Sequence, residues 1–276
     1  MTSGSVHQGG VAGTRWDTTQ YLRFADHRLR PALELLDRIA LESPGVVYDL
    51  GCGTGSVARL MAERWPGARV SGVDNSPQML ATAAATPARV RWVEADIERW
   101  QPEQAPDLIY SNATLHWVDG HRQLFPRLAG WLNPGGCLAV QMPLSWSTPS
   151  HVLMRATLAD GGPNGAPLGS AALRQSMDRD WVEPAALYYD LLSGLATNLD
   201  IWETEYLQIL EGEDAVLEWV KSTGLRPVLH GLDERERALF LTEYTRRLRN
   251  AYPLRAGGRT LYPFRRLFIV ATVAGR

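Results

Sequence analysis

Short apolar runs alternate with amphipathic stretches through the first half of the chain. The runs that have the length and composition of buried strands are 46–49, 70–74, 90–94, 107–111 and 137–142. Between them, apolar residues recur every three or four positions, which predicts helices over 31–39, 56–65 and 121–132 and a further helix beginning at Ser76-Pro77. A strand–helix repetition of this kind predicts a parallel sheet with helices on both faces.

The repetition breaks after residue 143. Residues 143–182 carry clusters of proline and glycine and predict an excursion of loops and helices. The pattern then predicts helices over 184–195, 215–222 and 233–251 and strands over 198–210 and 264–273. The expected fold is therefore α/β, a doubly wound, Rossmann-like sheet of about seven strands.

The order of these elements also predicts the domain organisation. Because the late helices lie between strands of the sheet in the sequence, we expect them to form a cap or lid rather than an independent domain. The insertions that form it lie around 143–182 and 211–262, within a single domain that spans 14–276. Residues 1–13 are rich in glycine, serine and threonine and are predicted to be a flexible leader.

Composition narrows the possible partners and compartments. Hydrophobic residues make up 45% of the chain and charged residues 21%, and the net charge is -2, so neither nucleic acid nor an anionic membrane is an expected partner. No stretch has the length of a membrane span and the first residues lack an apolar signal core, which predicts a cytoplasmic location. The two cysteines, Cys52 and Cys137, show neither a disulfide framework nor metal-ligand spacing, so no metal is expected.

The strongest chemical pattern lies where the first predicted strand ends. This strand ends in Asp49, and the glycines Gly51, Gly53 and Gly55 follow at once; the second strand ends in Asp74. Glycines allow a tight turn and a close approach of the backbone to a ligand, and a carboxylate after the second strand is placed to accept the hydroxyls of a ribose. The pattern predicts a nucleotide-type crevice at this edge of the sheet.

The spacing of the glycines distinguishes between the nucleotide-type ligands that such a crevice could bind. A dinucleotide fingerprint is spaced G-x-G-x-x-G, whereas this loop reads Asp49-Leu50-Gly51-Cys52-Gly53-Thr54-Gly55. This sequence resembles motif I of the class I S-adenosylmethionine (SAM)-dependent methyltransferases. A dinucleotide or other nucleotide binder, and a doubly wound domain with an incidental glycine-rich turn, are the alternatives.

Further stretches along the chain match the pattern of one methyltransferase family. They are Trp16-Asp17, Tyr21-Leu22, Phe24, Arg28-x-Arg30-Pro31, Val93-Glu94-Ala95-Asp96-Ile97, Asn112-Ala113-x-Leu115-His116-Trp117, Leu138-Ala139-Val140-Gln141-Met142-Pro143, His151-Val152-Leu153-Met154-Arg155, Tyr188-Tyr189-Asp190, Trp219-Val220, Thr223-Gly224-Leu225-Arg226-Pro227 and Arg266-Leu267-Phe268-Ile269-Val270-Ala271. In these segments the chain resembles the trans-aconitate methyltransferases, and the resemblance runs from Trp16 to the end. The chain differs from the family pattern at three places: the leader, the segment 159–181, which is longer than expected, and His116, where some relatives carry glutamine.

The resemblance implies SAM as the cofactor, with S-adenosyl-L-homocysteine (SAH) as its product, and a set of cofactor-binding residues. Asp49 would meet the methionine amino end, Asp74 the ribose and Asp96 the adenine amino group. The full set is Asp49, Gly51, Gly53, Asp74, Asn75, Met79, Asp96, Ile97, Asn112 and Ala113. Met79 could equally be an ordinary core residue.

The resemblance also implies a carboxylate acceptor. A carboxylate with an ordinary pKa near 4 is ionised at neutral pH, so methyl transfer to it needs no general base. His116 and Trp117 are the candidate catalytic residues, with positioning of the substrate as the favoured role of His116 and proton transfer as the alternative. The candidate substrate-binding residues are Tyr21, Arg28, Arg30, Trp146, Tyr188, Tyr189, Arg226 and Arg266.

The predicted function is therefore a SAM-dependent O-methyltransferase that forms the methyl monoester of trans-aconitate or a related small polycarboxylate. One alternative keeps the cofactor and changes the acceptor to another small natural product, and another is a SAM-binding protein without catalytic activity. The expected partner is a small carboxylate substrate, and the expected state is a monomer or a weak dimer.

Overall fold

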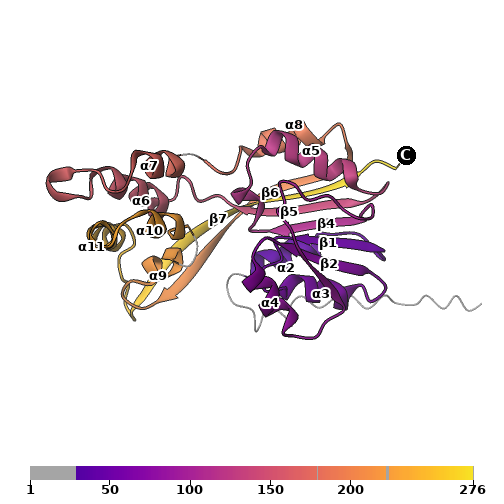
Figure 1. The fold of residues 1–276 in the computed structure, drawn as a ribbon, viewed down its shortest axis with the longest axis horizontal. Helices are drawn as coiled ribbons and strands as arrows, with labels where there is room; N and C mark the ends of the chain where they lie inside the picture. The colour runs from indigo at the N-terminus through magenta and orange to yellow at the C-terminus, as the bar shows by residue number, and fades with distance from the viewer. Residues whose placement is uncertain (1–28, 179, 222–223, 276) are drawn as a thin grey trace, which may run out of the picture.

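The computed structural model describes residues 29–178, 180–221 and 224–275 and contains one mixed sheet of seven strands in the order β3-β2-β1-β4-β5-β7-β6 (Figure 1). The strands are β1 (Val46–Leu50), β2 (Arg69–Asp74), β3 (Val90–Glu94), β4 (Leu108–Asn112), β5 (Cys137–Pro143), β6 (Ala196–Glu211) and β7 (Arg259–Val273). The first five are parallel, and β7 pairs antiparallel with both β5 and β6. The strand order reverses between β1 and β4, and a ligand crevice is expected outside the carboxyl ends of the strands at that point.

Helices cover both faces of this sheet. The helices α2 (Arg30–Asp37), α3 (Ser56–Arg64) and α4 (Pro77–Ala84) lie on one side, and α5 (His121–Trp131) and α8 (Ala185–Leu192) lie on the other (Figure 1). Alternate residues of β1 enter the two cores: Tyr48 and Leu50 pack towards α5, whereas Val47 packs towards α2 and α3. This period of two decides which face of the sheet each side chain covers, and the parallel direction of β1 and β2 brings Asp49 and Asp74 to the same end of the sheet.

The remaining helices form a separate layer around the far ends of β6 and β7 (Figure 1). They are α6 (Pro149–Asp160), α7 (Ala171–Met177), α9 (Ala215–Lys221), α10 (Arg226–Gly231) and α11 (Glu234–Ala251), and we call them the helical cap. Phe240, Tyr244, Leu225 and Val228 are buried in its own hydrophobic core, to which Tyr262 of β7 also belongs. The two stretches that the sequence predicts as insertions therefore pack on each other.

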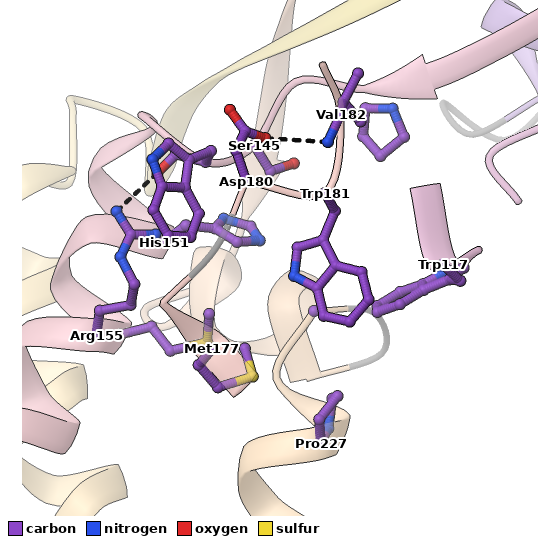
Figure 2. A pocket seen from close by; sticks show the side chains of 13 residues that line it. Trp117, Ser145, His151, Arg155, Met177, Asp180, Trp181, Val182 and Pro227 are labelled. Carbon is purple, nitrogen blue, oxygen red and sulfur yellow. Dashed lines mark hydrogen bonds between the residues drawn. The ribbon is translucent and has the colours of Figure 1, made fainter. Parts of the chain in front are cut away.

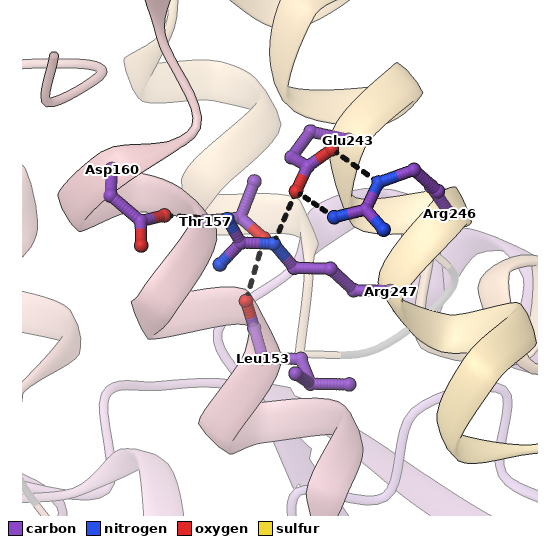
Figure 3. Close-up of polar contacts among 6 residues, drawn as sticks. All are labelled: Leu153, Thr157, Asp160, Glu243, Arg246 and Arg247. Atoms are coloured by element: carbon purple, nitrogen blue, oxygen red, sulfur yellow. Dashed lines mark hydrogen bonds and ion pairs between the residues drawn. The ribbon is translucent and has the colours of Figure 1, made fainter. Parts of the chain in front are cut away.

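An ion-pair network joins two helices of this cap (Figure 3). Arg247 of α11 donates to Glu243 on its own helix at 2.6 Å and to Asp160 at the end of α6 at 2.7 Å. Arg246 also pairs with Glu243, and together the two guanidinium groups lower the pKa of that carboxyl to about 2. The α6–α11 contact is thus polar at its rim and apolar inside.

The architecture confirms the predicted fold class and places most of the predicted elements. The strand β7 begins at Arg259, five residues before its predicted start, and β6 extends over 16 residues, so the two form a long hairpin that reaches the helical cap. The short helix α10 was not predicted, because Pro227 and Gly231 obscure the helical period. The predicted leader lies outside the described residues. Within the described ranges, no helix is both long and apolar enough to cross a membrane.

Candidate active site

An open cavity of about 1460 Å³, which includes its solvent-facing mouth, lies at the carboxyl ends of β1 to β4. Eight of the residues predicted to bind the cofactor line it: Gly51, Gly53, Asp74, Asn75, Met79, Asp96, Ile97 and Ala113. Four separate loops contribute these residues, and the parallel strand order brings the loops together. We call this space the cofactor cavity.

The glycine loop is held against the second strand by a carboxylate. The Gly53 N–H donates to Asp74 Oδ2 at 2.9 Å, and the Ser76 N–H donates to Asp74 Oδ1 at 2.9 Å. Gly53 has a φ of +53°, and a Cβ added there would meet no atom within 4 Å. Gly51, with φ +75°, instead faces Thr114 so closely that a Cβ would lie 2.1 Å from its side chain. Gly51 is thus required for packing, whereas Gly53 leaves space for a ligand.

Asp49 lies beneath this loop rather than in the cavity wall, with 3% of its surface exposed. Burial, followed by the charge of Asp74, raises the pKa of Asp49 to about 7, although a hydrogen bond from the backbone of Ala58 partly offsets the shift. The carboxylate of Asp74 thus disfavours the charge of Asp49 beside the same loop. Such a site favours a cationic group nearby, because the cation would stabilise both charges.

A second cavity continues from the first past the end of β4. Ala113, Trp117 and Arg226 line both cavities, and His116, His151 and Arg266 are among the other residues that line the second. Ala113 has a φ of +54°, which is uncommon for alanine, and its N–H donates to the Gln141 carbonyl at 2.9 Å. This strained residue therefore lies at the junction of the two cavities. We call the second one the acceptor cavity.

The acceptor cavity has a positive wall. Arg266 is buried on β7 and donates from Nη1 to Gln141 Oε1 at 2.8 Å, with its guanidinium 4.5 Å from the centre of the Phe264 ring. Arg226 lies at the first turn of α10, with its side chain exposed. The long hairpin and the helical cap thus each deliver one guanidinium to the same space. Two planar forks of this kind suit a ligand with more than one carboxylate.

Three buried polar atoms beside this wall have no hydrogen-bond partner among the described residues: Asn112 Oδ1, His116 Nδ1 and Gln141 Nε2. Gln141 pairs with Asn112 across β4 and β5, so two of the three belong to adjacent strand ends. Unpaired buried polar atoms are costly and are uncommon in folded proteins. Their grouping at the end of β4 indicates a site for a polar ligand.

The two histidines of the acceptor cavity are both shifted towards the neutral form. Burial, together with the nearby charge of Arg266 and the imidazoles of His121 and His151, lowers the pKa of His116 to about 3. Burial and the charge of Arg155 lower the pKa of His151 to about 4. His116 is therefore a neutral imidazole near pH 7 and a weak base, which favours a positioning role over proton transfer.

His116 and Trp117 belong to the 3₁₀ helix η1 (Leu115–Trp117), which a buried network holds in place. His121 Nε2 lies 2.9 Å from the Leu115 carbonyl, so this nitrogen donates and Nδ1 accepts a 2.7 Å hydrogen bond from the Tyr188 hydroxyl. The Glu183 N–H in turn donates to the Tyr188 oxygen at 3.1 Å. The network connects α8 to the backbone immediately before His116.

This network corrects the prediction that Tyr188 closes the substrate pocket. Tyr188 is fully buried between α5 and α8, with its ring 4.6 Å from that of Phe125, and it lines neither cavity. Tyr189 is 56% exposed and also lines neither of them. On a helix, adjacent residues point in different directions, and the apolar period of α8 places Tyr188 on the face that covers the sheet.

The structure places the remaining predicted substrate-binding residues in different parts of the molecule. Arg226 and Arg266 lie together in the acceptor cavity, and Trp146 lines an adjoining one. Arg30 lies instead on the surface of α2, paired with Glu34 at 2.8 Å and stacked on Tyr206. Arg30 thus lines none of these cavities, whereas Tyr21 and Arg28 fall outside the described residues. Asn112 ends β4 immediately before Ala113, but it lines neither the cofactor cavity nor the acceptor cavity.

Several residues of the acceptor cavity were missed by the sequence analysis as functional candidates. They are Gln141, Ser145, His151 and Tyr262, of which the last three line the cavity and Gln141 holds Arg266. Gln141 carried a detectable signal, because it is the only amide in the apolar run 137–142. Tyr262 carried none, since an aromatic residue in a strand is more often part of the core.

The cofactor cavity fits SAM. Gly53 leaves an open approach to the backbone, the Asp74 carboxylate is fixed at the strand end, and the buried Asp49 lies beneath the glycine loop. Among the described residues, no cluster of three or more histidine, cysteine or acidic side chains could hold a metal ion. The fold and this site define a class I SAM-dependent methyltransferase.

Comparisons with known proteins agree with that class and narrow it. A sequence model of a methyltransferase domain matches residues 47–136. The trans-aconitate 2-methyltransferase of Pseudomonas paraeruginosa is 48% identical over 261 residues, which cover 94% of both chains. The enzyme of that name from Methylobacterium radiotolerans is 49% identical over 94% of this chain and 98% of its own. The chain therefore belongs to the trans-aconitate 2-methyltransferase family.

A solved structure supports the fold at a greater distance. The phosphoethanolamine N-methyltransferase 2 of Haemonchus contortus, solved with S-adenosyl-L-methionine, superposes with a TM-score of 0.51 at 17% identity, covering 90% of this chain and 53% of that chain. At this identity the likeness shows the shared fold alone.

Proposed function

We propose that this protein transfers the methyl group of SAM to a carboxylate of trans-aconitate and so forms a methyl monoester. The observation that carries this proposal is the acceptor cavity, which is lined by Arg226, Arg266 and His116, whose buried Nδ1 has no hydrogen-bond partner among the described residues. The names of the relatives supply the particular acid, and the cavity supplies the chemistry that an acid with several carboxylates requires.

In this proposal, the cofactor cavity holds SAM along the ends of the first strands. Asp74 accepts hydrogen bonds from the ribose hydroxyls, Asp96 accepts one from the adenine amino group, and Ile97 and Met79 pack on the ring. Asp49 stabilises the cationic amino end from beneath the loop. Bound SAM supplies an electrophilic methyl group on a sulfonium sulfur.

The residues of this chain then orient the acceptor. Arg266 and Arg226 bind carboxylates that do not react, and the neutral His116 donates or accepts a hydrogen bond within the cavity. Trp117 covers the junction and excludes water from it. Because the attacking carboxylate is already ionised, orientation and desolvation provide the catalysis, and well-oriented reactions gain effective molarities of roughly 10⁵–10⁸ M.

Replacing His116 by alanine is expected to lower kcat about 10- to 100-fold without changing the shape of the pH profile between pH 5.5 and 8.5. The reason is that His116, with a pKa of about 3, does not titrate in this range. The measurement is kcat and kcat/KM across pH for the wild type and His116→Ala. The exposed His230 on α10 provides the control variant, His230→Ala. A wild-type inflection that only His116→Ala loses would instead establish proton transfer by His116.

The affinity for SAM is expected to rise about tenfold between pH 6 and pH 8. In the free protein the pKa of Asp49 is raised to about 7, so the carboxyl is mostly protonated at pH 6 and ionised at pH 8. A cationic ligand lowers this pKa, binding releases a proton, and the affinity therefore increases with pH until Asp49 is ionised. Calorimetric Kd values for the wild type and Asp49→Asn measure this, since the ratio of the two removes any titration of the ligand itself. If the ratio of the two Kd values is constant across pH, Asp49 does not stabilise the cationic end of SAM as proposed.

Conversion of SAM to SAH with a panel of acceptors tests the proposed function. The panel contains trans-aconitate, dicarboxylic acids, alcohols and amines. We expect turnover with trans-aconitate and weaker turnover with the dicarboxylic acids. Turnover only with an alcohol or an amine would favour another small-molecule acceptor, and SAM binding without turnover of any acceptor would favour a non-catalytic protein.

A further inference from the structure

A third cavity opens from the acceptor cavity on the side of the helical cap (Figure 2). Both cavities are lined by Trp117, Pro143, Ser145, His151 and Gly224, so they are continuous at this wall. Six apolar residues line only the third cavity: Trp146, Met154, Met177, Trp181, Val182 and Pro227. We call this space the apolar annex.

The annex and the acceptor cavity differ sharply in chemistry. The acceptor cavity has two guanidinium groups, whereas the annex is walled by indole rings and thioethers. Its one cationic side chain, among the lining residues, is Arg155, which stacks 3.6 Å from the centre of the Trp146 ring and donates to the Trp146 carbonyl at 3.1 Å. Its one acidic side chain, Asp180, accepts a hydrogen bond from the Val182 N–H at 3.1 Å. Both charged groups are therefore engaged with the wall itself.

Trp117 connects the three cavities, because it lines all of them. Its ring lies 5.8 Å from that of Trp181 in an edge arrangement, and Figure 2 shows the two indoles side by side at the mouth of the annex. Trp117 is nevertheless 46% exposed, which leaves a large apolar surface at the junction. A ligand that extends from the acceptor cavity into the annex would bury this surface.

Separate parts of the chain build the wall of the annex. Met177 lies at the end of α7, and Asp180 and Trp181 lie in the segment after that helix. Met154 comes from α6 and Pro227 from α10. The annex is thus formed between three helices of the cap and the segment that follows α7.

We propose that the preferred acceptor is a polycarboxylate that carries a linear alkyl substituent, and that the annex binds this substituent. The proposal rests on the proposed function and specifies its substrate class. The carboxylates remain at Arg226 and Arg266, and the alkyl group passes Trp117 into the annex. In the transfer step, a carboxylate oxygen forms a bond to the methyl carbon while the carbon–sulfur bond breaks, and the electron pair of that bond stays on sulfur.

The test is a series of trans-aconitates that carry methyl, propyl or hexyl groups on the saturated carbon. Their Kd values are measured by calorimetry on the full-length protein saturated with SAH, and their kcat/KM values with SAM. We expect Kd to fall about fourfold for each added methylene until the annex is filled, with an increasingly negative heat-capacity change. A Kd for the wild type that is constant or rises with chain length would overturn the proposal, and this arm needs no variant.

Met177→Trp fills the annex from α7 and is expected to reduce the gain between the methyl and hexyl compounds by at least tenfold. Val152→Trp is the matched control, because Val152 lies on α6 with 43% of its surface exposed and lines none of the three cavities. An undiminished gain in Met177→Trp would place the alkyl group elsewhere and overturn the proposal. If none of the acids is methylated, the proposed function fails, and the calorimetric series still decides whether the annex binds an alkyl chain.

Discussion

The Asp74→Ala variant is expected to bind SAM about 100- to 1000-fold more weakly than the wild type. The carboxylate of Asp74 fixes the glycine loop through the Gly53 N–H and caps the next segment through the Ser76 N–H. In the proposed complex it also accepts hydrogen bonds from two ribose hydroxyls. Hydrogen bonds to a charged group contribute about 1.5–3 kcal/mol each, and the loss of two at the lower end of this range, about 3–4 kcal/mol, corresponds to the expected change.

Calorimetry with SAM and SAH measures this change. The control is Glu94→Ala, which removes an exposed carboxylate from the residue that pairs with Asp74 on β3. Asp74→Asn keeps one acceptor oxygen, so its affinity for SAM is expected to lie between the affinities of Asp74→Ala and Glu94→Ala. If Asp74→Ala binds SAM as tightly as Glu94→Ala while both remain folded by circular dichroism, the ribose assignment is wrong.

Replacing Arg266 by lysine is expected to lower kcat/KM for trans-aconitate about 100-fold, with most of the change in KM. The guanidinium is buried, lines the acceptor cavity and is held in a fixed orientation by its hydrogen bond to Gln141. Lysine keeps the charge but cannot form the two parallel hydrogen bonds of a fork, and it loses the stacking on Phe264.

Steady-state kinetics with SAM at saturation measures this effect, and the Kd for SAM is expected to change less than threefold. Arg265→Lys is the matched control, since Arg265 is the neighbouring residue on β7 but is exposed and paired with Glu203 on the surface. Equal KM values for the two lysine variants would remove Arg266 from the substrate site.

Most of the sheet could be predicted from the sequence because its strands are separated by clear helical periods. The residues at the strand ends, such as Asp74 and Ala113, follow directly from that prediction, since parallel strands end at the same edge. The glycine spacing further distinguished the cofactor. At these positions the strand and helix periods and the residue types predict the same location for the site. The cofactor cavity was therefore the part of the site that the sequence predicted best.

The acceptor side was less predictable because it depends on contacts between distant parts of the chain. Arg226 and Arg266 lie 40 positions apart in the sequence. They line the same cavity only because the hairpin of β6 and β7 reaches the helical cap. Tyr188 and Arg30 carried the expected residue types, but helix orientation directs one into the core and the other to the surface. The oligomeric state, the compartment and the role of the leader stay predictions from the sequence.

The most direct test of the proposed function is the transfer of a ¹³C-labelled methyl group from SAM to trans-aconitate, with the product identified by mass spectrometry and NMR. We expect one added methyl group whose carbon is bonded to an ester oxygen of the acid, together with an equal amount of SAH. Formation of SAH without this ester, or a label on carbon or nitrogen of another acceptor, would contradict the proposed function.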